Sequence, residues 1–125
     1  MPAACRKTVV LVDDDVEIRH VMTAILSHEG YDVATASNGL EAMTRLRAMR
    51  RPCVILLDLM MPVMDGWQFR ARQKDDPGLA EIPVVVLSAV PNVSDRAASL
   101  QADAYLQKPV DLDDLLQTVG RYCGE

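Results

Sequence analysis

Short apolar runs alternate with longer amphipathic segments along the whole chain. Residues 8–12, 53–57 and 84–87 are almost entirely apolar and rich in β-branched side chains, whereas 31–36 and 104–106 are weaker runs. Uninterrupted apolar runs of this length are typical of strands buried on both faces of a sheet. Turn residues such as Pro, Gly, Asn and Asp separate the runs from the segments between them. The pattern therefore predicts five strands.

Between the runs, apolar residues recur with the helical period of three to four positions. A first helix is expected between a cap at Asp15 and a stop at Gly30, and a last helix after a cap at Asp111. Three further helices are expected over residues 40–49, 67–74 and 94–100. The side chains expected to face inward are Ile18, Val21, Met22, Ile25, Leu26, Leu40, Met43, Leu46, Trp67, Phe69, Leu112, Leu115, Leu116 and Val119.

Strand and helix thus alternate five times, which predicts an α/β fold: a parallel sheet between two layers of helices. Ligands of such doubly wound folds bind outside the carboxyl ends of the strands. Polar side chains that follow the strands are therefore the candidates for a functional site.

Composition narrows the class of protein. The chain has 125 residues, a net charge of −5 and a pI near 4.9, so we expect one domain over 1–125 (core about 8–122), without an output domain or a nucleic-acid partner. The odd number of cysteines, Cys5, Cys53 and Cys123, predicts free thiols in a reducing compartment. The chain lacks a signal segment and an apolar stretch long enough to span a membrane, which predicts a cytoplasmic protein without a membrane partner.

Carboxylates follow two of the apolar runs. Asp13 and Asp14 come directly after residues 8–12, and Asp58 directly after 53–57. Carboxylates gathered at one sheet edge repel one another unless a cation lies between them, and Mg²⁺ prefers such hard oxygen ligands. We expect Asp14 and Asp58 to bind Mg²⁺ or Mn²⁺ directly, Asp13 to act through water, and the main-chain carbonyl of Met60 to complete the set.

Three residues at other strand ends suit a phosphoryl group. Lys108, which precedes Pro109, supplies a mobile cation for phosphate oxygens. Ser88 offers a hydroxyl donor, and the small Ala89 beside it leaves the approach open. A carboxylate that attacks a phosphoryl group forms an acyl phosphate, and catalysis is then positioning and charge neutralisation.

Four motifs in this order carry a resemblance to a known family. They are Val-Asp-Asp-Asp at 12–15, Leu-Asp-Leu-Met-Met-Pro-Val-Met-Asp-Gly at 57–66, Leu-Ser-Ala at 87–89 and Tyr-Leu-Gln-Lys-Pro at 105–109. The chain resembles the receiver domain of two-component response regulators, a family that includes the single-domain chemotaxis regulator. The resemblance extends from about Thr8 to Tyr122.

The resemblance implies a flavodoxin-like fold with five helices and a five-stranded parallel sheet in the order 2-1-3-4-5. It implies that Asp58 accepts a phosphoryl group from the phosphohistidine of a sensor histidine kinase or phosphotransfer protein. Asp13 and Asp14 would hold Mg²⁺, while Ser88 and Lys108 contact the phosphoryl group. Tyr105 matches the family's switch aromatic, which turns inward on phosphorylation. This movement would change the face made by the fourth helix, fifth strand and fifth helix, to which a downstream protein binds. We also expect a cis peptide between Lys108 and Pro109.

The chain departs from the family pattern at three places. Gln101 replaces the usual Gly, so the left-handed end of the fourth helix is not expected. The interval between Ser88 and Lys108 is about two residues shorter than in the best-known members and contains Pro91, which predicts a short or irregular fourth helix. Met60 and Val90 beside the phosphoryl pocket are apolar and cannot orient an attacking water, which predicts a long-lived phosphoryl group.

Two alternatives remain at this stage. The first is a haloacid-dehalogenase-like phosphatase with Asp13 as the nucleophile. The motif order of that family is matched by Asp13-x-Asp15, Ser88, Lys108 and Asp113-Asp114. That interpretation leaves Asp58 and its loop unexplained. The other is a docking module that works without phosphorylation. We favour a phosphorylation-operated switch that modifies only itself and is not an enzyme for any other substrate; pairing into a homodimer stays open.

Overall fold

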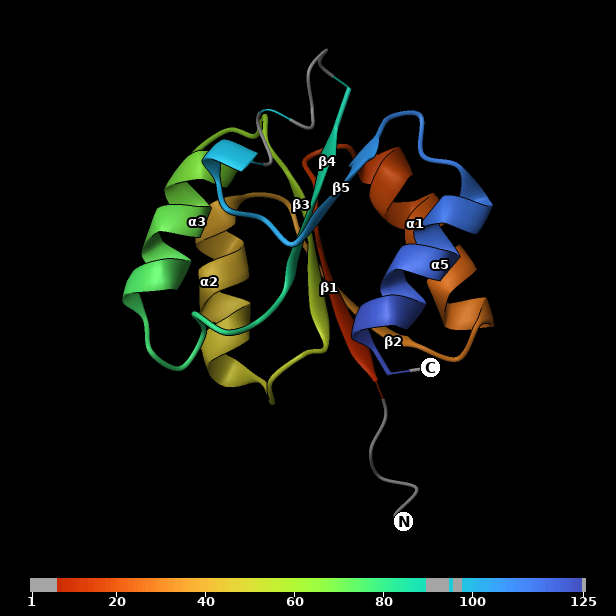
Figure 1. Ribbon diagram of the computed structural model, residues 1–125, viewed down its shortest axis with the longest axis horizontal. Helices are drawn as coiled ribbons and strands as arrows, with labels where there is room; N and C mark the ends of the chain where they lie inside the picture. Colours follow the sequence, from red (N-terminus) through yellow and green to blue (C-terminus); the bar gives the residue numbers. More distant parts are fainter. Residues whose placement is uncertain (1–6, 90–94, 96–97, 125) are drawn as a thin grey trace.

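Five parallel strands form one sheet between two layers of helices (Figure 1). The computed structural model describes residues 7–89, 95 and 98–124. The sheet order is β2-β1-β3-β4-β5, which is the predicted order. The strands are β1 (Thr8–Val12), β2 (Asp32–Ala36), β3 (Val54–Asp58), β4 (Val84–Ser88) and β5 (Ala104–Gln107). The helices are α1 (Val16–His28), α2 (Gly39–Ala48), α3 (Gly66–Asp75) and α5 (Leu112–Tyr122).

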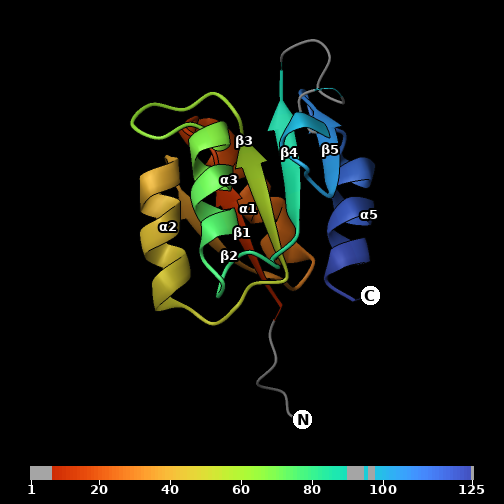
Figure 2. The same cartoon turned by 60° about the vertical axis from the view of Figure 1, so that its left-hand side comes forward.

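The three central strands are buried because helices cover both faces of the sheet. Successive strand side chains point to opposite faces, so Val10 and Val12 pack under α2 and α3, while Val9 and Leu11 pack under α1 and α5. Figures 1 and 2 show these two helix pairs on opposite sides of the sheet. The edge strands β2 and β5 are less buried than the central ones. The continuous apolar runs therefore mark the centre of the sheet.

Side-chain caps begin the helices at the positions that the sequence indicated. Asp15 accepts main-chain hydrogen bonds at the start of α1, and Asp111 does so at the start of α5. Asp65 and Gln68 form a capping box at the start of α3. These caps fix the loops that leave the carboxyl ends of β1, β3 and β5.

The expected fourth helix lies mostly outside the described residues. Four helices are present in the part of the chain that the structure describes, and 95, 98 and 99 are helical. The expectation for Gln101 was wrong: its φ is 57°, the left-handed conformation that glycine usually supplies. Nη2 of Arg70 donates to the carbonyl of Gln101 (2.7 Å), and Lys74 binds its side chain. These contacts hold the strained backbone from α3.

Three helix positions expected to face the core are exposed instead. Val21 is 55%, Leu40 50% and Leu112 49% exposed. Leu40 and Leu112 lie in the first turn of α2 and of α5, whereas Val21 lies at the margin of an apolar stripe on α1 that is wider than the buried contact. Val21 and Leu112 line a surface groove of about 370 Å³ between α1 and the start of α5. Among the described residues, no helix is long and apolar enough to cross a membrane.

Cys53 and Cys123 form a disulfide, so the prediction of free thiols was wrong for this pair. Cys5 lies outside the described residues. Cys53 precedes β3 and Cys123 follows α5, and their Cα atoms are 5.1 Å apart although 70 positions separate them in the sequence. The disulfide ties the end of α5 to the amino end of the sheet, opposite the edge that carries the acidic residues.

Reducing this disulfide is expected to lower the free energy of unfolding by about 4 kcal/mol, because it releases the loop-closure constraint on the unfolded chain. Urea unfolding with and without a reductant measures the change. A Cys53→Ala/Cys123→Ala double variant is the control and should not respond to the reductant. An unfolding midpoint of the native chain that is independent of reductant would contradict the prediction.

Candidate functional site

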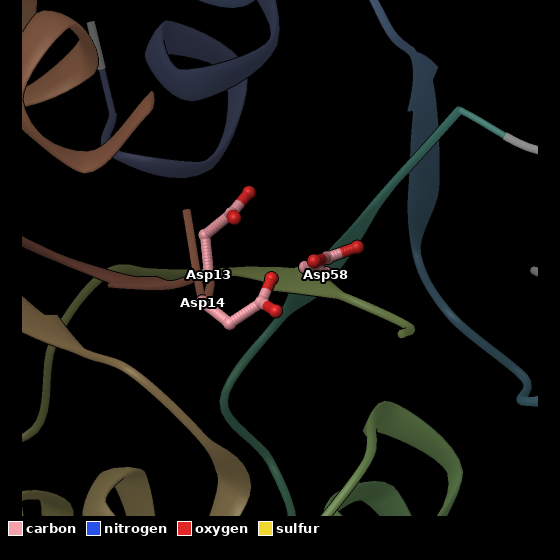
Figure 3. Close-up of side chains that lie close together, drawn as sticks. All are labelled: Asp13, Asp14 and Asp58. Carbon is pink, nitrogen blue, oxygen red and sulfur yellow. The ribbon is translucent and has the colours of Figure 1, made fainter. Parts of the chain in front are cut away.

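Three carboxylates meet at the carboxyl edge of the sheet (Figure 3). Asp13 and Asp14 follow β1, and Asp58 is the last residue of the adjacent strand β3. One carboxylate oxygen from each lies within 4.8 Å of the others. The parallel pairing of β1 with β3 brings the two strand ends together, as the sequence predicted.

Asp13 is completely buried, and each of its carboxylate oxygens accepts a hydrogen bond. Its Oδ2 accepts a hydrogen bond from Nζ of Lys108 at 2.7 Å, and its Oδ1 accepts one from the main-chain amide of Asp15 at 2.9 Å. The main-chain amide of Asp13 donates to the carbonyl of Ala36 on the neighbouring strand. Asp14 is exposed, and one of its carboxylate oxygens lies within 4.8 Å of those of Asp13 and Asp58. One acid is thus held rigidly and the other remains accessible.

Asp58 is only 6% exposed and has weaker partners. Nζ of Lys108 lies 3.6 Å from its Oδ1, and the main-chain amide of Met60 donates to the same oxygen at 3.4 Å. Burial raises the pKa of Asp58 to about 6. Lys108 opposes that rise, while the negative charges of Asp13 and Asp14 add to it. A cation in the pocket would relieve this unfavourable environment.

Lys108 and Ser88 come from adjacent strands. The main-chain amide of Lys108 donates to the carbonyl of Ser88 at 2.8 Å, which continues the β4–β5 pairing to the site. Ser88 is 1% exposed, and the following Ala89 is exposed. The Lys108–Pro109 peptide is cis, as predicted. Tyr105 on β5 is 49% exposed in this state.

Two glycines fix the loop that follows Asp58, a role beyond the turns that the sequence predicted at these positions. The amide of Gly66 donates to the carbonyl of Leu59 at 2.9 Å, and the amide of Gly39 donates to the carbonyl of Met64 at 2.9 Å. A Cβ on Gly66 would lie 2.9 Å from the carbonyl oxygen of Asp58, and one on Gly39 would lie 2.9 Å from that of Met64. The loop can approach α2 and α3 this closely only because glycine has no side chain. The Asp-Gly pair at 65–66 was the available signal.

Arg19 also contacts the site, which the sequence did not indicate. Its Nη1 donates to the main-chain carbonyl of Asp13 at 2.7 Å. An arginine one turn into α1 is not distinguishable by sequence from any other polar helix residue. The contact depends on how α1 leaves the turn after β1.

The donor set suits a hard divalent cation. Three carboxylates with oxygens within 4.8 Å of one another provide the oxygen ligands that Mg²⁺ and Mn²⁺ prefer. The main-chain carbonyl of Met60 belongs to the loop directly after Asp58. No histidine or cysteine belongs to this cluster within the described residues. The arrangement can hold a metal ion beside a nucleophilic carboxylate and an ammonium group.

The raised pKa of Asp58 gives a stability prediction for the metal-free protein. The folded state binds this proton more tightly than the unfolded state, whose carboxyl has a pKa of 3.8 against about 6 when folded. The stabilisation from the neutral acid is present below pH 3.8 and is lost as the pH rises through about 6. Other groups also titrate, so urea unfolding of Asp58→Asn and of the native chain across this pH range would isolate the contribution of Asp58. The stability difference in favour of the variant should grow with pH, and a constant difference would contradict the assignment.

Comparison with known proteins identifies the family. Residues 9–120 match the model of the response regulator receiver domain. The chain belongs to this family, and it is a receiver domain of two-component signalling. Membership agrees with the four motifs and counts against the haloacid-dehalogenase-like alternative.

Two curated relatives are similar over most of this chain. It is 42% identical over 110 residues to the response regulator MprA of Mycobacterium sp. strain KMS, covering 86% of this chain and 46% of that protein. It is 34% identical over 113 residues to the DNA-binding dual master transcriptional regulator RpaA of Synechocystis sp., covering 89% and 46%. The chain therefore spans about half the length of these relatives. The expectation of no nucleic-acid partner is not borne out, because a relative is named for DNA binding.

A solved structure supports the fold. The receiver domain of the sensor histidine kinase PA1611 from Pseudomonas aeruginosa PAO1 is 26% identical to this chain. It superposes with a TM-score of 0.85 and covers 97% of this chain and 100% of that one. That structure has a magnesium ion coordinated in its active-site cleft.

Proposed function

We propose that the protein is a phosphorylation switch in which Asp58 accepts a phosphoryl group in the presence of Mg²⁺ or Mn²⁺. The donor would be the phosphohistidine of a sensor histidine kinase or phosphotransfer protein. The observation that carries the proposal is Asp58 at the end of β3, with Asp13, Asp14 and Lys108 around it. A nucleophile, a cation site and a phosphate-binding ammonium group occur together only here among the described residues.

The transfer conserves atoms and charge. An oxygen of Asp58 forms a bond to phosphorus while the phosphorus–nitrogen bond of the phosphohistidine breaks, and the imidazole leaves with the electron pair. The product is an acyl phosphate on Asp58. Lys108 is near enough to Asp58 to move its ammonium group from Asp13 toward the phosphoryl oxygens. The hydroxyl of Ser88 would donate to another oxygen, and Ala89 leaves room for the group.

The metal site draws on residues of two loops. Asp14 and Asp58 would bind the cation directly, Asp13 would bind through water, and the Met60 carbonyl would add a neutral ligand. When bound, the cation neutralises charge that develops on the phosphoryl oxygens. The buried Asp13 keeps its place through Lys108 and the amide of Asp15. The chain itself therefore supplies the nucleophile, the phosphate contacts and the orientation of the acids.

The output would arise from small rearrangements near β4 and β5. Drawing the Ser88 hydroxyl toward a new dianion frees space beside β4, into which the half-exposed Tyr105 can turn. A downstream protein, or a second copy of the chain, would then meet a changed face around β5 and α5. On this account the protein modifies only itself and turns over no other substrate.

Intact-mass spectrometry after incubation with acetyl phosphate tests the proposal. We expect one phosphoryl adduct that requires Mg²⁺ or Mn²⁺ and disappears when the cation is chelated. Acetyl phosphate removes the need for a cognate kinase because it carries its own activated phosphoryl group. An adduct formed equally well without a divalent cation would contradict the proposed chemistry.

The phosphoryl group is expected to persist for minutes or longer. Met60 beside the pocket is 59% exposed and apolar, so it cannot orient an attacking water; Val90 lies outside the described residues. Decay of phospho-Asp58 can be followed by intact mass after the donor is removed. Met60→Gln should shorten the lifetime by adding a polar group, whereas Val63→Gln, at a 75% exposed position of the same loop, should not. Decay of the native chain within seconds would refute the prediction.

A further inference from the structure

The turn between β1 and α1 carries two of the three acids and has little regular structure of its own. Asp13 is completely buried, whereas Asp14 is exposed. The amide of Asp15 donates to Oδ1 of Asp13, and Oδ1 of Asp15 in turn accepts from the amides of Glu17 and Ile18. The side chains of this turn are therefore tied to the start of α1.

Arg19 contacts both ends of the same turn. Its main-chain amide donates to the carbonyl of Asp15 at 3.0 Å, which is the first hydrogen bond of the helix. Its side-chain Nη1 donates to the carbonyl of Asp13 at 2.7 Å. The guanidinium is partly buried, and its planar fork makes a directional contact. Asp13, Asp15 and Arg19 are thus joined pairwise by hydrogen bonds.

The carbonyl that Arg19 holds belongs to the peptide joining Asp13 to Asp14. The six atoms of a peptide unit lie close to one plane, so fixing this oxygen also fixes the amide nitrogen of Asp14. The direction in which the Asp14 side chain leaves the main chain depends on that plane. Arg19 can therefore orient an acid that it does not touch.

We propose that Arg19 is a positioning residue for the divalent-cation site, acting through the main chain of the Asp13–Asp14 turn. The inference rests on the proposed function, since it concerns the same cation. Residues that orient metal ligands from outside the ligand set commonly change metal affinity by about 10–100-fold when they are mutated. Arg19 would contribute by limiting the orientations open to Asp14.

If Arg19 acted through its charge alone, its removal would have the opposite effect on the affinity for Mg²⁺. A guanidinium near the site repels a divalent cation, so its removal would tighten binding if charge were its main influence. Loss of positioning would weaken binding instead. The sign of the change in affinity therefore distinguishes the two roles.

A matched control is available at the opposite part of the fold. Nη2 of Arg51 donates to the carbonyl of Glu81 at 2.8 Å, a contact of the same kind and similar length. Removing either arginine side chain deletes one bond to a main-chain carbonyl. Arg51 lies before β3, away from the carboxyl edge of the sheet. A merely structural contribution should thus appear in both variants.

The experiment is isothermal titration of Mg²⁺ into the native chain, Arg19→Met and Arg51→Met at about pH 8, where Asp58 is ionised. We expect the Kd for Mg²⁺ to rise about tenfold in Arg19→Met and to stay unchanged in Arg51→Met. Circular dichroism checks the fold of each variant. If Arg19→Met does not fold, Arg19→Gln removes the charge and the long fork while keeping a polar side chain, and the same rise is expected.

Two outcomes would overturn the inference and can be told apart from failure of the proposed function. Unchanged or tighter binding in the folded Arg19 variant, with normal binding by the native chain, overturns the positioning role alone. Equal weakening in Arg51→Met does so too, because the effect would then be general. A native chain that binds no Mg²⁺ overturns the proposed function and the inference with it.

Discussion

Asp58→Asn is expected to abolish phosphorylation and to make the metal-free protein more stable by about 2 kcal/mol near neutral pH. Asparagine has no nucleophilic carboxylate, so the acyl phosphate cannot form. Burial raises the pKa of the Asp58 carboxyl to about 6, so the ionised form is unfavourable at this position. The neutral amide of asparagine has no charge to desolvate. The same change removes repulsion from Asp13 and Asp14. Activity and stability should therefore move in opposite directions.

Intact mass and urea unfolding measure the two effects on the same samples. Asp65→Asn is a matched control, because asparagine also caps helices well and Asp65 lies at the start of α3. It should keep the adduct and change stability little. A persistent adduct in Asp58→Asn would show that Asp58 is not the nucleophile. A loss of stability in the metal-free variant would show that the Asp58 carboxylate is not in an unfavourable environment.

Lys108→Ala is expected to have the opposite effect on stability, a loss of about 3 kcal/mol in the absence of metal. Nζ of Lys108 is 2.7 Å from Oδ2 of Asp13, which is completely buried, so the variant leaves a buried charge without its cation. Mg²⁺ would supply positive charge to the same pocket and should restore much of the loss. Lys108 is also expected to bind the phosphoryl oxygens. The variant should therefore accept a phosphoryl group on Asp58 without the conformational change around β5 and α5.

Urea unfolding with and without Mg²⁺ measures the effect on stability, with Arg72→Ala, at an exposed position of α3, as the control. The double variant Asp58→Asn/Lys108→Ala should regain part of the stability, since one of the acids facing the missing cation is then neutral. For transmission, ¹H–¹⁵N spectra of β5 can be compared before and after adding beryllofluoride. Equal spectral shifts at Tyr105 in the native chain and in Lys108→Ala would contradict a coupling role for the lysine.

Much of the fold was accessible from sequence because its elements are locally encoded. The apolar runs that became β1, β3 and β4 are buried on both faces, and Asp15 and Asp111 cap the helices where expected. The site followed from the same logic, since the ends of parallel strands share one edge. The expected positions of the acids, Ser88 and Lys108 needed only the strand boundaries.

The features that sequence analysis missed depend on tertiary contacts. Cys53 and Cys123 meet because α5 packs back on the sheet, which their spacing of 70 does not reveal. Gln101 adopts a left-handed conformation because Arg70 holds its carbonyl from another helix. Arg19 acts on the turn through a main-chain atom, so its residue type carries no signal. The helical period also cannot tell how wide a stripe the sheet covers, which is why Val21 was assigned to the core.

The central claim is that Asp58 itself carries the phosphoryl group, and its chemical trapping is the most direct test. Borohydride reduces an acyl phosphate on aspartate to homoserine, which tandem mass spectrometry locates by residue. After incubation with acetyl phosphate and Mg²⁺, we predict homoserine at position 58 and at no other aspartate, and none when Mg²⁺ is omitted. Homoserine at position 13 instead would contradict the account and support the phosphatase-type nucleophile.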